Sequence, residues 1–170
     1  MLLKLEQEKF QISNLNQHTH WLSTVTMWHH QEWLKASDYP ADHPESETKF
    51  QERKCALQAH LSSQKLPVTF VAHANDKPIG TVSLVYYNVQ NEHPPSEWLS
   101  NLYVVPQFRQ RGIASELLNV ALRHAKELGL QRLLLYTRDQ ADFYKKRHWR
   151  FLTFGTVQRQ RVSVLDYLIR

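Results

Sequence analysis

Hydrophobic residues in the second half of the chain recur at three- and four-residue steps, which is the spacing of an amphipathic helix. From Ile113 onward they include positions 117, 118, 121, 122, 125 and 128. Gly129 follows at the place where a helix commonly ends on a glycine. The pattern predicts a helix over residues 113–128 with one buried face.

Runs rich in β-branched and aromatic residues flank this helix. Strands are predicted at residues 2–10, 68–72, 79–86, 98–105 and 133–136. The turn residues 75–78 join two of these runs into a hairpin. Because a strand, a helix and a strand follow one another over residues 98–137, we expect a right-handed crossover between two parallel strands.

The N-terminal third has helical spacing of large apolar residues. Trp21, Val25 and Trp28 form a buried stripe on a helix predicted over residues 16–36. A loop with two prolines is expected over residues 37–46, and a second helix over residues 47–62. Helices and strands thus mix along the chain, as in an α/β protein.

Length and composition narrow the class of protein. A chain of 170 residues with 42% hydrophobic and 22% charged residues fits one folded domain and excludes a disordered one. A charge at position 4 and the lack of a long apolar run argue against a signal peptide or a transmembrane helix, so we expect a cytoplasmic protein with no membrane partner. The single cysteine, Cys55, is expected to be a buried thiol, and no metal-ligand spacing occurs.

Charge is unevenly distributed along the chain. Residues 1–100 hold 8 Lys and Arg against 11 Asp and Glu, whereas residues 101–170 hold 13 against 5. The C-terminal part should therefore attract an anion, whether nucleic acid, a phosphorylated cofactor or an anionic membrane. We expect no nucleic-acid partner, because the basic residues cluster at one glycine turn and at residues 145–147 without a recognition helix or an aromatic RNA motif.

The segment between the strand at 98–105 and the helix at 113–128 has the chemistry of a phosphate site. Arg109 and Arg111 lie beside the first turn of the helix, where backbone N–H groups have no partner within the helix. Gly112 allows a tight turn and the close approach of a ligand, and the small Ala114 leaves room for it. The loop therefore predicts a pyrophosphate-binding site.

The loop Arg109-Gln110-Arg111-Gly112-Ile113-Ala114 matches the cofactor loop Q/R-x-x-G-x-G/A of the GNAT N-acetyltransferase superfamily. The preceding strand, the helix ending at Gly129, the next strand and the segment 142–146 also follow the family's order, so that the chain resembles this family over about residues 66–157. The resemblance implies the GNAT fold in a single domain over residues 1–170. This is an α/β (α+β) fold with a mixed, mostly antiparallel sheet of about six to seven strands and helices on both faces.

The resemblance also implies the reaction and the residues that bind acetyl-CoA, its co-substrate. The pantetheine arm is expected on the backbone of the strand and the pyrophosphate on the N–H groups of the loop. Tyr144 matches a tyrosine beside the thioester sulfur, where a phenol of pKa about 10 can donate a proton to the departing thiolate. The cofactor-binding residues so assigned are Leu102, Tyr103, Val104, Arg109, Gln110, Arg111, Gly112, Ile113, Ala114, Ser115, Phe143 and Tyr144.

An amine that attacks a thioester must first lose a proton. Glu97, at the start of the cofactor strand, is the candidate base, and a water held by Ser100 or Asn101 is the alternative. His148 stands where the family commonly has glycine after the tyrosine helix. Either the histidine adopts the left-handed backbone of that glycine, or the turn is reshaped.

The acceptor is expected to be a small-molecule or peptide amine, acetylated by direct attack in a ternary complex, in a monomer or homodimer. Trp28, Trp33 and Tyr39 offer aromatic faces to a cationic amine, and acids of the N-terminal loop offer charge. These acids are Asp38, Asp42, Glu45 and Glu47, for which a merely solvated loop is the alternative. A non-catalytic CoA sensor or partner-binding module on the same fold is the second function that the sequence leaves open.

Overall fold

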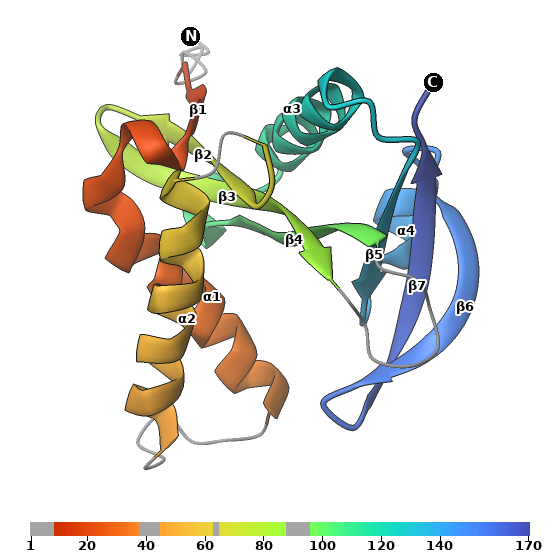
Figure 1. Ribbon diagram of the computed structural model, residues 1–170, viewed down its shortest axis with the longest axis horizontal. Helices are drawn as coiled ribbons and strands as arrows, with labels where there is room; N and C mark the ends of the chain where they lie inside the picture. The colour runs from red at the N-terminus through yellow and green to blue at the C-terminus, as the bar shows by residue number, and fades with distance from the viewer. Residues whose placement is uncertain (1–8, 38–44, 63–64, 88–95) are drawn as a thin grey trace, which may run out of the picture.

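The computed structural model describes residues 9–37, 45–62, 65–87 and 96–170 and contains a sheet of seven strands (Figure 1). The strands are β1 (Gln11–Asn14), β2 (Val68–Ala74), β3 (Lys77–Tyr87), β4 (Ser96–Val104), β5 (Arg132–Thr137), β6 (Arg150–Val157) and β7 (Gln160–Leu168). Their order in the sheet is β1-β2-β3-β4-β5-β7-β6. All neighbours are antiparallel except β4 and β5, which confirms the mixed, mostly antiparallel sheet and the parallel crossover.

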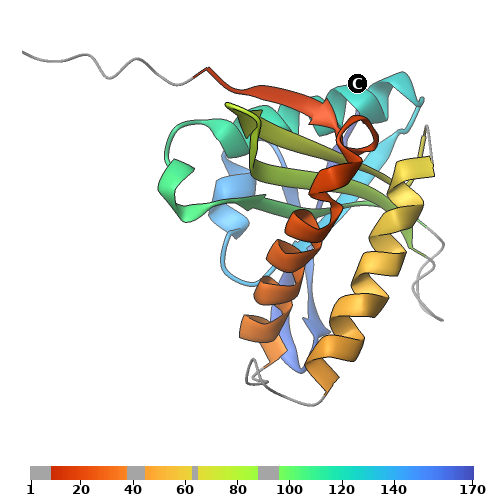
Figure 2. The same ribbon diagram turned by 90° about the vertical axis from the view of Figure 1, so that its left-hand side faces the viewer.

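Four helices and three short 3-10 turns accompany the sheet in the described part of the chain. The helices are α1 (Leu22–Ser37), α2 (Glu45–Ser62), α3 (Ile113–Glu127) and α4 (Ala141–Lys145), and the turns are η1 (Leu15–Gln17), η2 (Thr19–Trp21) and η3 (Pro106–Phe108). Figures 1 and 2 show α1 and α2 side by side on one face of the sheet and α3 on the other. Within the described residues, no helix has the length and hydrophobicity needed to cross a membrane.

The two faces of the sheet are set by alternation along the strands. In β2, Phe70 and Ala72 join the core that α3 covers, whereas Val71 between them joins the cluster formed with α1 and α2. This is the period-two pattern of a strand buried on both faces. Trp21, Val25 and Trp28 belong to that second cluster, as the predicted stripe requires, and Leu57 of α2 packs with them.

Local signals placed most elements correctly. The predicted hairpin is β2 and β3, and the predicted helix at 113–128 is α3, after which Gly129 has φ of +75°. The helix predicted from residue 16 begins only at Leu22, because Asn14 caps the turn η1 by accepting a hydrogen bond from the Asn16 N–H at 3.0 Å. The first strand predicted at 2–10 falls mostly outside the described residues, and the observed strand begins at Gln11.

The prediction for Cys55 is wrong, because its side chain is exposed on α2. That helix buries Leu57 and His60, and a residue two positions from Leu57 lies on the opposite side of a helix with 3.6 residues per turn. Amphipathicity is weak in this mostly polar segment, so its buried face could not be chosen from the sequence.

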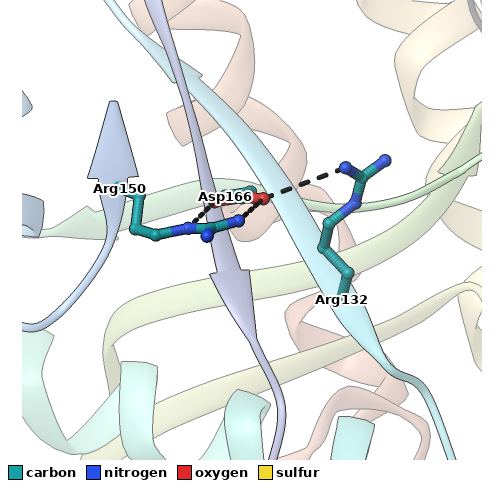
Figure 3. Close-up of polar contacts among 3 residues, drawn as sticks. All are labelled: Arg132, Arg150 and Asp166. Carbon is teal, nitrogen blue, oxygen red and sulfur yellow. Dashed lines mark hydrogen bonds and ion pairs between the residues drawn. The ribbon is translucent and has the colours of Figure 1, made fainter. Parts of the chain in front are cut away.

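A buried carboxylate ties the last strands together. Asp166 of β7 is fully buried and lies opposite Arg150 of β6, whose Nε and Nη2 donate to its two oxygens at 2.9 and 2.8 Å (Figure 3). Arg132 of β5 approaches the same carboxylate from the other side at 3.8 Å. The hydrogen bonds and charge of Asp166 raise the pKa of Arg150. Three strands thus share one ion-pair centre.

Removing this charge should weaken the C-terminal half of the sheet. We expect Asp166→Asn to lower the melting temperature by several degrees, since it leaves a buried polar group against two arginines without a counter-charge. Glu127→Gln, which removes an exposed negative charge at the end of α3, serves as the control in thermal unfolding. Equal melting temperatures for the two variants would show that the ion pairs of Asp166 contribute nothing to thermal stability.

Candidate active site

Strands β4 and β5 separate soon after they meet. Among the described residues they pair only at Trp98 and Leu134. Strand β4 also contains a bulge, since Thr81 and Ser83 of β3 lie opposite Tyr103 and Ser100, which are three positions apart. Asn101, within the bulge, has φ of +55°. The edge of β4 beyond Trp98 is therefore open to an extended ligand on the side of β5.

Backbone alternation decides which residues face this opening. The Val105 N–H donates to the Ile79 carbonyl of the neighbouring segment at 2.9 Å, so the backbone groups of Val105 and of Tyr103 point toward β3. Those of Leu102 and Val104 point toward the opening. Arg109 confirms this direction for Val104, because its Nε donates to the Val104 carbonyl at 2.8 Å.

The loop after β4 ends in a glycine with a left-handed backbone. Gly112 has φ of +82°, and apart from its neighbours in the chain no atom lies within 4 Å of a Cβ built on it. The first helical hydrogen bond of α3 joins the Glu116 N–H to the Gly112 carbonyl at 3.1 Å. The N–H groups of Ile113, Ala114 and Ser115 consequently have no acceptor within the helix, and they lie at its positive end.

Three arginines surround this helix start. Arg109 bonds to β4 as described, and Arg111 is exposed with its guanidinium 5.2 Å from the Phe108 ring centre. Arg147, which the sequence analysis did not assign, donates from Nε and Nη2 to Ser115 Oγ at 3.2 and 3.0 Å. Its Nη1 also donates to the Phe143 carbonyl at 2.8 Å. The basic run at 145–147 was the sequence feature that could have indicated Arg147. Only the fold shows that this member of the run reaches α3.

Tyr144 is buried on α4 between two aromatic rings. Phe143 and Trp149 meet it edge to face, with centroids at 5.1 and 5.8 Å. Burial raises the pKa of Tyr144 to about 12, above the value of about 10 expected from sequence. The phenol therefore stays protonated throughout the physiological range and is a weaker acid than an exposed tyrosine.

The turn after α4 keeps its glycine-like form with histidine in place. His148 has φ of +71°, the Trp149 N–H donates to the Tyr144 carbonyl at 3.2 Å, and the His148 N–H donates to the Lys145 carbonyl at 3.2 Å. These two bonds define a Schellman motif, whose hydrophobic contact is the packing of Trp149 on Tyr144. Of the two alternatives at His148, the left-handed histidine is correct, and the turn holds Tyr144 in place.

An open cleft of about 550 Å³ lies where β4 and β5 separate. Its lining includes Leu102 and Tyr144 from the predicted site, together with Ser100 and Asn101. Glu97 is not part of the lining; it lies opposite Tyr86, near the start of β4. The structure thus places the tyrosine beside the splayed strand, and the candidate base outside the cleft.

The other side of the cleft contains residues that the sequence analysis missed. His29 and Arg53 come from α1 and α2, and Tyr136 comes from β5. Burial, reinforced by His60 and Arg53, lowers the pKa of His29 to about 3, so this imidazole is neutral. No local motif marks these residues, because they meet only through the packing of the two helices beside the sheet.

A second cleft of about 580 Å³ lies between α3 and the end of β7. It is lined by residues such as Arg123, Lys126 and Tyr167 and contains none of the predicted cofactor or catalytic residues. We therefore place the candidate site at the separation of β4 and β5, where Leu102 and Tyr144 of the predicted residues line the same cleft.

The family of the chain follows from its sequence match. The model of the acetyltransferase (GNAT) family matches residues 26–149, a span that includes β4, the glycine loop, α3 and Tyr144. The chain belongs to the GNAT acetyltransferase family. As a member, it is an acyltransferase, and the family match supports acetyl transfer as its general reaction. No curated protein matches the sequence significantly.

Solved structures of GNAT acetyltransferases share the fold. A GCN5-related N-acetyltransferase from Ralstonia eutropha has a TM-score of 0.70 at 17% identity, covering 88% of this chain and 97% of its own. PaiA N-acetyltransferase from Thermoplasma acidophilum, in complex with coenzyme A, has a TM-score of 0.66 at 22% identity, covering 94% and 99%. A GNAT acetyltransferase from Streptococcus pneumoniae has a TM-score of 0.65 at 21% identity, covering 95% and 100%.

Proposed function

We propose that this GNAT protein transfers the acetyl group of acetyl-CoA to a primary amine by direct attack in a ternary complex. The observation that carries the proposal is the arrangement of two open backbone surfaces. The splayed edge of β4 leads by a short loop to the unbonded N–H groups at the start of α3. A ligand with an amide-bearing arm and a pyrophosphate matches both surfaces.

The residues present fit this co-substrate. Ile113, Ala114 and Ser115 would bind the pyrophosphate through backbone N–H groups, with Arg111 and Arg147 adding positive charge. The backbone of Leu102 and Val104 would bind the pantetheine amides. Acetyl-CoA supplies an activated acetyl group and a thiolate leaving group.

Tyr144 would stabilise the departing thiolate by donating a hydrogen bond. Its position in the cleft and its raised pKa keep a proton on the phenol oxygen at neutral pH. Because a pKa of about 12 makes complete proton transfer to a thiolate unfavourable, hydrogen-bond donation is the better description of this role. The backbone N–H of Val104, which points toward the opening beside β4, would face the developing negative charge on the acetyl oxygen, whereas that of Tyr103 points toward β3.

Water in the cleft would remove the proton from the attacking amine. Glu97 does not line the cleft, and the low pKa of His29 makes this imidazole a poor base. Ser100 and Asn101 do line it and offer polar groups that can hold a water. The proposal therefore assigns the relay to water near these two residues rather than to Glu97.

A panel of amines tests the proposed function. Primary amines, amino acids, polyamines, aminoglycosides and peptide N-termini are each incubated with acetyl-CoA and the protein, and free thiol is measured. We expect at least one class to accelerate thiol release in proportion to protein concentration. If acetyl-CoA binds but no amine in the panel accelerates thiol release, the sensor hypothesis replaces the proposed reaction.

A further inference from the structure

The described residues that line the cleft beside Tyr144 include more basic than acidic side chains. Glu32 and Lys35 both line it and neutralise each other in an ion pair of 3.0 Å. Among the described residues of the lining, Arg53 and Arg138 then stand against Asp139 alone. Of the acids expected to attract a cationic amine, Glu45 and Glu47 lie on the first turn of α2 outside the lining, and Asp38 and Asp42 fall outside the described residues.

Of the two arginines in the described lining, Arg138 is exposed and donates to Gln158 at 2.7 Å, whereas Arg53 forms no ion pair with any described residue. Arg53 is half-buried, and among the described residues its Nε has no hydrogen-bond partner. In the described part of the chain, Glu52 is the carboxylate that acts on the pKa of Arg53, and it is itself paired with Lys49 at 3.1 Å. Burial of the guanidinium, which removes part of its hydration, lowers the pKa of Arg53. An incoming anion would restore the lost interactions.

The surroundings of Arg53 favour a planar oxyanion. Its guanidinium carbon lies 5.0 Å from the centre of the Trp33 ring, and a guanidinium stacked on an indole keeps its N–H edge available for a bidentate carboxylate. Tyr136, which lines the same cleft, is close enough to influence the pKa of Arg53, and its hydroxyl is a further donor.

We propose that the acceptor carries a carboxylate beside its amine, as a free amino acid does, and that Arg53 binds this carboxylate while the amine faces Tyr144. The proposal rests on the proposed acetyl transfer and names its substrate class. Arg53 and Tyr144 line one cleft, whose volume of about 550 Å³ suits a single small molecule that contacts both. Such an acceptor differs from the cationic amine that the acids of the N-terminal loop suggest, of which Asp38 and Asp42 lie outside the described residues.

Matched acceptors and matched variants test the role of Arg53. Each α-amino acid of a set with apolar, polar and charged side chains is compared with its α-carboxamide, which keeps the amine and loses the carboxylate charge. The wild-type protein should prefer the free acid. Arg53→Gln should raise the KM for the free acid by about 10- to 100-fold with little change in kcat, and should leave the carboxamide unaffected. The KM of Arg53→Lys for the free acid should lie between those of the wild-type protein and Arg53→Gln, because lysine keeps the charge but loses the bidentate geometry.

Two controls keep the outcomes distinct. Arg123→Gln removes the same charge from the second cleft and should not change the preference for the free acid. The melting temperature of each variant, with and without acetyl-CoA, shows whether the fold and the co-substrate site are intact. Equal rates for acids and carboxamides in the wild-type protein, or equal losses with both in Arg53→Gln, would overturn the carboxylate proposal alone. Absence of acetylation with every amine would instead overturn the proposed function.

Discussion

Replacing Gly112 with glutamate should abolish the rise in melting temperature that acetyl-CoA gives the wild-type protein. The new side chain places a negative charge where the N–H groups of Ile113 to Ser115 would hold the pyrophosphate. A ligand present at one hundred times its Kd stabilises the native state by about 2.7 kcal/mol. For a chain of this size, that raises the melting temperature by roughly 5–10 °C. Thermal unfolding with and without acetyl-CoA measures the loss.

Gly129→Glu is the matched control for this prediction. Gly129 also has a left-handed backbone, with φ of +75°, and likewise has no atom within 4 Å of a Cβ built on it. The two substitutions therefore introduce the same charge and the same backbone strain at opposite ends of α3. If acetyl-CoA still raises the melting temperature of Gly112→Glu, the co-substrate binds elsewhere. The same conclusion follows if both variants lose the rise in melting temperature.

Removing the hydroxyl of Tyr144 should reduce kcat by about 100-fold, with little change in the KM for acetyl-CoA. Tyr144→Phe keeps the ring that packs between Phe143 and Trp149, so the loss reports the hydrogen bond to the leaving thiolate. Steady-state kinetics with the best acceptor from the amine panel measures the change.

Tyr167→Phe provides the comparison in the same aromatic cluster. Its ring lies 5.4 Å from Trp149, but the residue lines the second cleft, so loss of its hydroxyl should leave kcat unchanged. Full activity in Tyr144→Phe, or an equal loss in both variants, would refute the role of the Tyr144 hydroxyl.

The parts of this fold that depend on neighbouring residues could be predicted from sequence. Hydrophobic spacing located α3, and Gly112 and Gly129 marked its ends, because both positions require a positive φ. His148 was harder, since the same left-handed turn can be formed by histidine at some cost, and only the observed backbone decides between the alternatives.

Features that depend on distant contacts could not be predicted. Arg147 meets Ser115, and Arg53 meets the cleft, through packing between elements far apart in the sequence. The pKa of Tyr144 depends on burial between Phe143 and Trp149, which no motif records. Side chains alternate between the two faces of a strand, but a bulge interrupts this alternation in β4. The sequence therefore did not determine to which face the Glu97 side chain points.

The stoichiometry of one turnover tests the account most directly. Acetyl-CoA, an acceptor from the panel and excess protein are mixed, and free CoA, acetylated amine and acetylated protein are quantified by mass spectrometry. Direct attack in the cleft predicts one acetylated amine for each CoA released, with no acetylated protein and no turnover in Gly112→Glu. CoA release without acetylated amine, or an acetyl group retained on the protein, would contradict it.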